Sequence, residues 1–105
     1  MVIVETPIFT RRIQTMFTDE EYRLLQAYIV NKPDSGKVIR GSGGLRKLRW
    51  SASGHGKRGG IRIIYYWFVK KDIILLLFVY PKSEQDELTY EQLRQLRKVI
   101  EGEYL

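Results

Sequence analysis

The first part of the chain carries apolar residues at helical spacing. A short β-prone run at residues 2–4 is followed by Thr6 and Pro7, a pair typical of a helix N-cap and the first helical position. Beyond them, Phe9 and Ile13 recur at the spacing of one buried helical face. This pattern predicts a short strand that leads into an amphipathic helix.

Two further helices are indicated by capping signals. Thr18 precedes Glu21, and Thr89 precedes Gln92, in each case by three residues. In such a pair the threonine hydroxyl accepts from the backbone N–H of the later residue, whose side chain bonds back to the threonine N–H. Apolar residues follow both pairs at helical spacing. We therefore predict one helix after Thr18 and a last helix that runs to about residue 101.

The segment between these two helices has the pattern of β-strands. Within residues 45–50, Lys47 and Arg49 fall on one face of an extended chain and Leu48 and Trp50 on the other, which predicts a strand with one charged and one packed face. Residues 61–69 and 73–80 are β-prone runs joined by three residues, a connection that requires an antiparallel hairpin. The second run is apolar at nearly every position, so both of its faces should be covered.

The predicted order of elements is β-α-α-β-β-β-α. It indicates a single α+β domain over residues 1–105, with a mainly antiparallel four-stranded sheet packed against helices. The chain has no cysteine and one histidine, so disulfides and thiolate metal sites are excluded and we expect no metal or cofactor. The longest apolar run, residues 73–80, is too short to span a bilayer. A cytoplasmic protein without a membrane partner is expected.

Positive charge is concentrated in the middle of the chain. Although the whole chain carries +6, no acidic residue lies between Asp34 and Asp72. The ten basic residues of this stretch are Lys37, Arg40, Arg46, Lys47, Arg49, Lys57, Arg58, Arg62, Lys70 and Lys71. The remaining residues, with eight basic and twelve acidic side chains, sum to −4. This asymmetry indicates a surface that faces a polyanion, with nucleic acid as the first candidate.

Three residues stand out within this stretch. Lys47 and Arg49 share one face of the strand predicted at residues 45–50, and Leu48 lies on the other. Arg62 interrupts an otherwise apolar strand, where an arginine must pair, reach the surface or meet a ligand. Guanidinium groups remain charged and bind phosphate oxygens in pairs, so both arginines are candidates for holding a phosphate.

Three sequence motifs resemble those of a known family. They are Gly-Gly-Leu-Arg-Lys-Leu-Arg-Trp at 43–50, Gly-Lys-Arg-Gly-Gly-Ile-Arg-Ile-Ile-Tyr-Tyr at 56–66, and Val-Tyr-Pro-Lys-Ser-Glu at 79–84. In this order they resemble the RelE/ParE superfamily of bacterial toxins, and most closely the HigB-type members of its RelE branch. The resemblance extends over nearly the whole chain.

The resemblance implies the toxin of a type II toxin–antitoxin system. Such a protein is an mRNA interferase that cleaves mRNA in the ribosomal A site, inhibits translation and is neutralised by a cognate HigA-like antitoxin. By position, the resemblance assigns catalytic roles to Lys47, Arg49, Arg62 and Lys82, with Tyr90 as the candidate for the catalytic tyrosine of some members. The predicted RNA-binding residues are Lys37, Arg40, Arg46, His55, Lys57 and Arg58.

RNA cleavage of this type uses the 2′-hydroxyl of the substrate as the nucleophile and requires no metal. A base removes the hydroxyl proton, an acid protonates the leaving 5′-oxygen, and cations hold the phosphorane. Lys47 and Lys82 are candidates for proton transfer or for simple phosphate binding, so the acid and the base remain unassigned.

Other functions fit the same features. A ParE-like poison of DNA gyrase would share the fold without nuclease chemistry. A non-catalytic RNA- or ribosome-binding module would keep the basic face but tolerate the loss of any single cation.

Overall fold

The computed structural model describes residues 1–51 and 60–103 of the chain. Its elements are β1 (Val2–Glu5), α1 (Pro7–Met16), α2 (Asp19–Asn31), β2 (Lys37–Val38), β3 (Arg46–Trp50), β4 (Ile61–Phe68), β5 (Ile73–Pro81) and α3 (Tyr90–Glu103). This is the predicted α+β class. All the predicted strands and helices are present, and β2 is an additional strand.

The strands form a five-stranded sheet in the order β1-β5-β4-β3-β2. β1 runs parallel to β5, whereas the other neighbouring strands are antiparallel. The prediction of four strands was therefore wrong by one edge strand. β2 pairs only Lys37 with Lys47 and Val38 with Arg46, and two residues are too few to produce a detectable period-two pattern.

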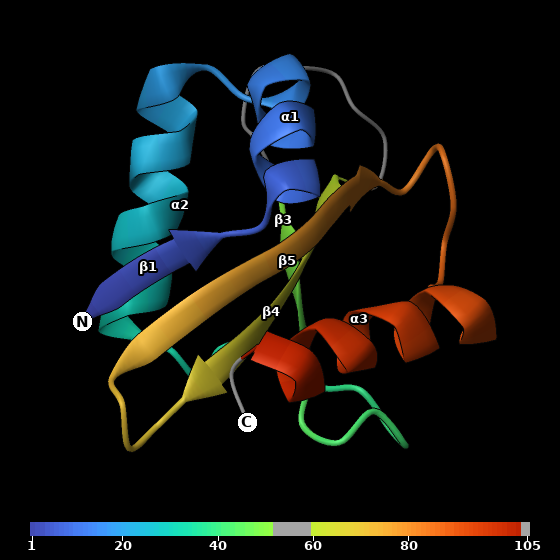
Figure 1. The fold of residues 1–105 in the computed structure, drawn as a ribbon. Helices are drawn as coiled ribbons and strands as arrows, with labels where there is room; N and C mark the ends of the chain where they lie inside the picture. Colours follow the sequence, from blue (N-terminus) through green and yellow to red (C-terminus); the bar gives the residue numbers. More distant parts are fainter. Residues whose placement is uncertain (52–59, 104–105) are drawn as a thin grey trace.

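Helices cover both faces of the sheet (Figure 1). α1 and α2 lie on one side and α3 lies on the other. The core under α1 and α2 includes Phe9, Ile13, Leu25, Ile29, Leu48, Ile63, Tyr65, Ile74 and Leu76. The core under α3 includes Leu45, Ile64, Leu75, Leu77, Phe78, Tyr80 and Ile100. This double cover explains why β5 is apolar throughout, as predicted.

Helix starts have the predicted caps. The Thr6 side chain accepts from the Phe9 N–H at the start of α1. Thr18 and Glu21 form the reciprocal bonds of a capping box before α2. The Thr89 hydroxyl accepts from the backbone N–H of Gln92, whose side-chain oxygen accepts from the Thr89 N–H before α3. No helix in the described residues is long and apolar enough to cross a membrane.

A bulge interrupts the pairing between β4 and β5. Tyr65 pairs with Leu76, and Ile64 pairs with Phe78. Leu77 therefore has no cross-strand partner on β4. One extra residue shifts the alternation of all later side chains to the opposite face.

The bulge decides which side chains of β5 face α3. Beyond it, Phe78 and Tyr80 lie in the core under α3, whereas regular alternation would have placed them under α1 and α2. Nearby backbone carbonyls are bonded by side chains from the first helix and its cap. The Thr6 hydroxyl donates to the Leu77 carbonyl at 2.8 Å, and Arg12 Nε donates to the Val79 carbonyl at 2.7 Å.

Gly60 should be essential to the start of β4. Its φ is +73°, and an added Cβ would lie 2.5 Å from the Trp50 carbonyl oxygen. Gly41 has a similar φ of +72° but open space around it. We expect Gly41→Ala to cost about 1–2 kcal/mol, the price of the left-handed conformation, and Gly60→Ala to cost clearly more. Chemical denaturation of both variants tests this, and equal losses would contradict it.

Candidate nucleic-acid interface

The sheet places basic residues directly opposite one another. Lys37 of β2 pairs with Lys47 of β3, and Arg49 of β3 pairs with Arg62 of β4. Directly opposed side chains have Cβ atoms about 5 Å apart, and like charges in such positions are destabilising. Two like-charged pairs on three neighbouring strands therefore form a surface that is costly to build and suited to an anion.

Burial differs among these cations. Arg62 is 4% exposed, whereas Arg49 is exposed and the Lys47 side chain is 16% exposed. Burying a charged side chain is costly in general, and strongly desolvated charges are concentrated at functional sites. Arg62 is therefore a buried cation, and its cross-strand partner Arg49 is exposed to solvent.

A cavity of about 570 Å³ opens beside this surface. Its lining residues are Ser35, Lys37, Val38, Ile39, Arg40, Lys47, Leu48, Arg49 and Glu87. We call it the cationic cavity. Four of the nine lining residues are basic and one is acidic. A concave surface of one charge sign concentrates the field and attracts counter-charged ligands.

Glu87 supplies the negative charge of the cationic cavity. It lies in the segment between β5 and α3, and its Oε1 is 3.3 Å from Lys47 Nζ. The Glu87 side chain is 72% exposed, so the pair is accessible to solvent and weak. A carboxylate held by a lysine in this way occupies a position that a phosphate oxygen could take. Sequence reasoning missed Glu87, since forty residues separate it from Lys47.

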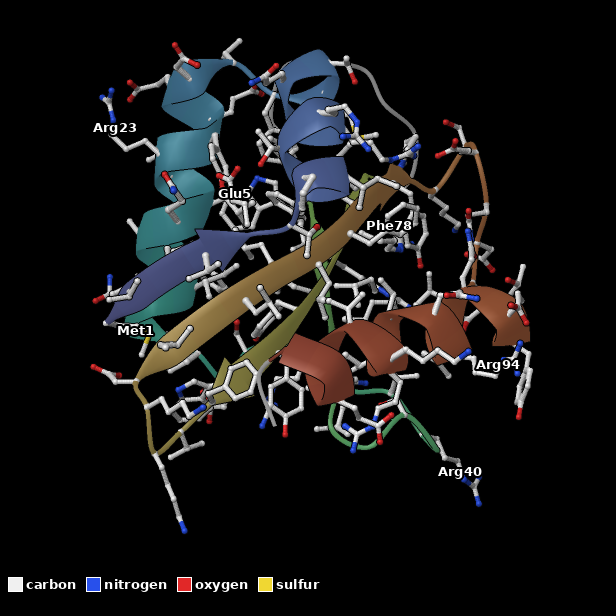
Figure 2. The ribbon with its side chains drawn as sticks, in the orientation of Figure 1. Met1, Glu5, Arg23, Arg40, Phe78 and Arg94 are labelled. Atoms are coloured by element: carbon white, nitrogen blue, oxygen red, sulfur yellow. The ribbon has the colours of Figure 1, made fainter. Side chains whose placement is uncertain are left out.

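Two predicted RNA-binding residues, Lys37 and Arg40, line the cationic cavity together with Lys47 and Arg49. Figure 2 shows Arg40 extending away from the body of the molecule. Arg46 lies on the opposite face of β3 and is engaged by the fold. Its Nη1 donates to the Gly36 carbonyl at 2.8 Å and to the Asp34 carbonyl at 3.2 Å.

The remaining predicted residues either do not line the cationic cavity or lie outside the described residues. Lys82 is exposed on the turn after β5, where its backbone N–H donates to the Gly60 carbonyl. Tyr90 is 81% exposed at the start of α3 and lines a second cavity, of about 310 Å³. That cavity is also lined by Gly41, Ser42, Gly43, Leu93, Arg94 and Arg97. His55, Lys57 and Arg58 lie outside the described residues.

Tyr80 is a further residue of this face that the sequence did not suggest. Arg62 pairs with Arg49 on one side and with Tyr80 on the other. Arg49, Arg62 and Tyr80 therefore form one row across three strands, which we call the arginine–tyrosine row. Burial raises the pKa of the Tyr80 phenol, and Glu87 raises it further, while Arg62 and Arg49 oppose this rise. The phenol is thus neutral, and a donor, at physiological pH.

Comparison with solved structures identifies the fold. The Escherichia coli toxin RelE, as a double mutant in the free state, matches with a TM-score of 0.62 at 12% sequence identity, covering 90% of this chain and 94% of that one. The intact E. coli RelBE toxin–antitoxin complex matches with a TM-score of 0.58 at 14% identity, covering 76% of this chain and 94% of that one. No protein-family model matches the sequence.

The chain therefore has a RelE-like fold, as its sequence motifs predicted. Both identities are low, so the likeness concerns the fold. The closer resemblance to HigB-type members stays a prediction.

Removal of the Glu87 charge should strengthen anion binding. In Glu87→Gln, Lys47 no longer has a competing carboxylate, so affinity for a single-stranded RNA oligonucleotide should rise by roughly two- to fivefold. The matched control is Glu101→Gln, which changes the net charge equally but removes a partner of Arg97 on α3. Fluorescence anisotropy at fixed salt measures both. An equal effect of the two variants would indicate net charge alone.

Proposed function

We propose that this protein is the toxin of a type II toxin–antitoxin system and acts as a ribosome-dependent mRNA endonuclease. One observation carries the proposal: the sheet sets Lys37 opposite Lys47 and Arg49 opposite Arg62, beside a cavity lined by basic side chains. Like charges in directly opposed positions are destabilising, and a bound anion would offset that cost. The RelE-like fold supports the choice of RNA among polyanions.

In the proposed reaction the substrate supplies its own nucleophile. The 2′-oxygen attacks the adjacent phosphorus and loses its proton to a base. The bond from phosphorus to the 5′-oxygen breaks, and an acid protonates the leaving oxygen. A 2′,3′-cyclic phosphate and a 5′-hydroxyl result, so no water or metal enters the bond changes.

Arg49 and Arg62 are the proposed ligands of the phosphorane. Negative charge on the non-bridging oxygens grows as the 2′-oxygen attacks, and fixed guanidinium groups stabilise that charge without reorganising. Lys47 binds the phosphate in place of Glu87, and Lys37 and Arg40 hold the neighbouring phosphates. Lys47, Lys82 and Tyr90 are the candidates for the acid and the base, and substitution of each in turn distinguishes among them.

The ribosome supplies the geometry that this small site lacks. The cationic cavity is open and holds few groups that could align a flexible RNA strand. In-line attack requires the 2′-oxygen, the phosphorus and the leaving oxygen to be nearly collinear, and correct placement of reacting groups contributes several kcal/mol to catalysis. In this proposal, the ribosomal A site holds the mRNA so that these three atoms are nearly collinear. Naked RNA should therefore be cleaved poorly.

A protein partner should neutralise this activity in the cytoplasm. The solved RelBE complex is a toxin–antitoxin pair with the same toxin fold, and it supports an antitoxin partner here. The antitoxin, HigA-like by the sequence resemblance, would cover the cationic cavity or block entry to the ribosome. Co-expression with the protein encoded beside this gene should then restore growth and yield a stable complex.

Mapping of RNA ends in expressing cells tests the proposed function. Expression of the chain should arrest translation and produce new 5′-hydroxyl ends within translated reading frames, and blocking translation initiation should abolish these ends. Intact mRNA together with gyrase trapped on DNA would replace the proposal with the gyrase-poison alternative. Ribosome binding without any new ends would indicate the non-catalytic module.

Loss of either arginine should reduce turnover more than binding. For Arg49→Ala and Arg62→Lys we expect turnover on translating ribosomes to fall on the order of a hundredfold, with ribosome affinity nearly unchanged. Arg62→Lys keeps the buried charge but loses the paired donors, which separates catalysis from folding. The control Arg23→Ala removes an exposed arginine from the outer side of α2 (Figure 2).

The same assay assigns the acid and the base. Lys47→Ala, Lys82→Ala and Tyr90→Phe should each be followed over a range of pH, and loss of one limb of the pH–rate profile identifies a proton-transfer group. Parental turnover in both arginine variants would show that the proposed active site is wrong.

A further inference from the structure

The hydroxyl group of Tyr80 is buried, and no hydrogen-bond partner for it lies in the part of the chain that the structure describes. The Tyr80 side chain is 0% exposed, and its Oη has no hydrogen-bond partner among the described residues. Burial of a hydroxyl without a hydrogen bond lowers the stability of the folded state. Phenylalanine would fill nearly the same space without that cost, so the retained hydroxyl requires an explanation.

Tyr65 shows how the same sheet treats a structural tyrosine. Its side chain is also 0% exposed, but its hydroxyl donates to the Pro33 carbonyl at 2.7 Å and accepts from the Gly36 N–H at 2.9 Å. These bonds fasten the segment before β2 to β4. Tyr65 lies in the core under α1 and α2, whereas Tyr80 lies in the core under α3. Of these two tyrosines, Tyr80 is the one whose hydroxyl has no partner among the described residues.

The surroundings of Tyr80 favour an anion as its missing partner. Tyr80 ends the arginine–tyrosine row, directly opposite Arg62. The bulge at Leu77 is what places its ring on this face, and bulges re-aim side chains next to active sites. The charges that act on its pKa, after burial, are those of Glu87, Arg62, Asp86 and Arg49, in that order. Two of them, Glu87 and Arg49, line the cationic cavity.

We propose that Tyr80 Oη is the third donor of the phosphate site, giving a hydrogen bond to a non-bridging oxygen of the phosphate held by Arg49 and Arg62. This assignment deepens the proposed function and rests on it for the identity of the substrate. A neutral phenol donates at physiological pH without adding charge to a row that already has two cations.

For this contact, the Tyr80 hydroxyl must become accessible when the substrate enters. Asp86 and Glu87 lie in a bend between β5 and α3, and the Glu87–Lys47 ion pair ties this bend to β3. A phosphate that takes Lys47 would release the Glu87 carboxylate from β3, while the bonds between Gln85 and Gln92 still hold the segment to α3. The Tyr80 hydroxyl, which has no partner among the described residues, would then donate to the bound phosphate.

Paired Tyr→Phe variants test the assignment. Tyr65→Phe removes a satisfied hydroxyl, so its Tm should fall by roughly 5–15 °C, with cleavage retained below the transition. Tyr80→Phe removes an unsatisfied hydroxyl, so its Tm should be unchanged or higher. Its turnover on translating ribosomes should nevertheless fall about tenfold at unchanged ribosome affinity, the loss of one hydrogen bond to a charged group. A lower Tm for Tyr80→Phe, or parental turnover, would overturn the proposal.

A second measurement does not depend on cleavage. The protein is labelled with 3-fluorotyrosine, and the ¹⁹F resonances of positions 80 and 65 are assigned with the two variants. Addition of a 2′-O-methyl RNA oligonucleotide, which cannot be cleaved, should shift the resonance of position 80 and leave that of position 65 in place. Absence of a shift at position 80 would overturn the assignment.

The two measurements separate this assignment from the proposed function. If the parent leaves mRNA intact but position 80 still responds to the oligonucleotide, the phosphate site stands and the nuclease proposal fails. If the parent cleaves mRNA and Tyr80→Phe cleaves it equally well, the nuclease proposal stands and Tyr80 is not part of it.

Discussion

The register between β3 and β4 is the constraint on which the rest of the structure depends. It sets Arg49 opposite Arg62, and the short β2 adds Lys37 opposite Lys47. Each pair opposes folding, because like charges lie side by side on one sheet face. The apolar cores on both faces of β4 and β5 provide the stability that permits this arrangement. The scaffold therefore stabilises a sheet face on which cations lie directly opposite one another.

The two sides of the sheet differ in their polar side chains. Under α1 and α2, the Tyr65 hydroxyl bonds to the Pro33 carbonyl and the Gly36 N–H, and the Arg46 guanidinium bonds to the Gly36 carbonyl. On the α3 side, Lys37, Lys47 and Arg49 line the cationic cavity, whereas Arg62 and the Tyr80 phenol are buried in the row that Arg49 begins. Arg12 of α1 contacts a residue of the core under α3. Its guanidinium lies 4.9 Å from the Phe78 ring centroid, and it also pairs with Glu84 after β5.

Local sequence signals were enough to predict most of the fold. Caps such as Thr18 with Glu21, and the apolar run of β5, depend on neighbouring residues and could be read directly. The RelE-like fold followed from motifs on β3, β4 and the exit from β5. Features that depend on distant pairing could not be read. A bulge at Leu77 has no local signature, so the face of Tyr80 was unpredictable, and Glu87 reaches Lys47 only through the tertiary fold.

A structure of the protein on a ribosome would test the central claim most directly. The mRNA should carry a 2′-O-methyl group at the cleavage position, so that the substrate stays intact in the A site. The account predicts that the α3 side of the sheet faces the mRNA, with the Arg49 and Arg62 guanidinium groups on the scissile phosphate. Contact with mRNA through the α1 and α2 side, or a binding position outside the A site, would contradict it.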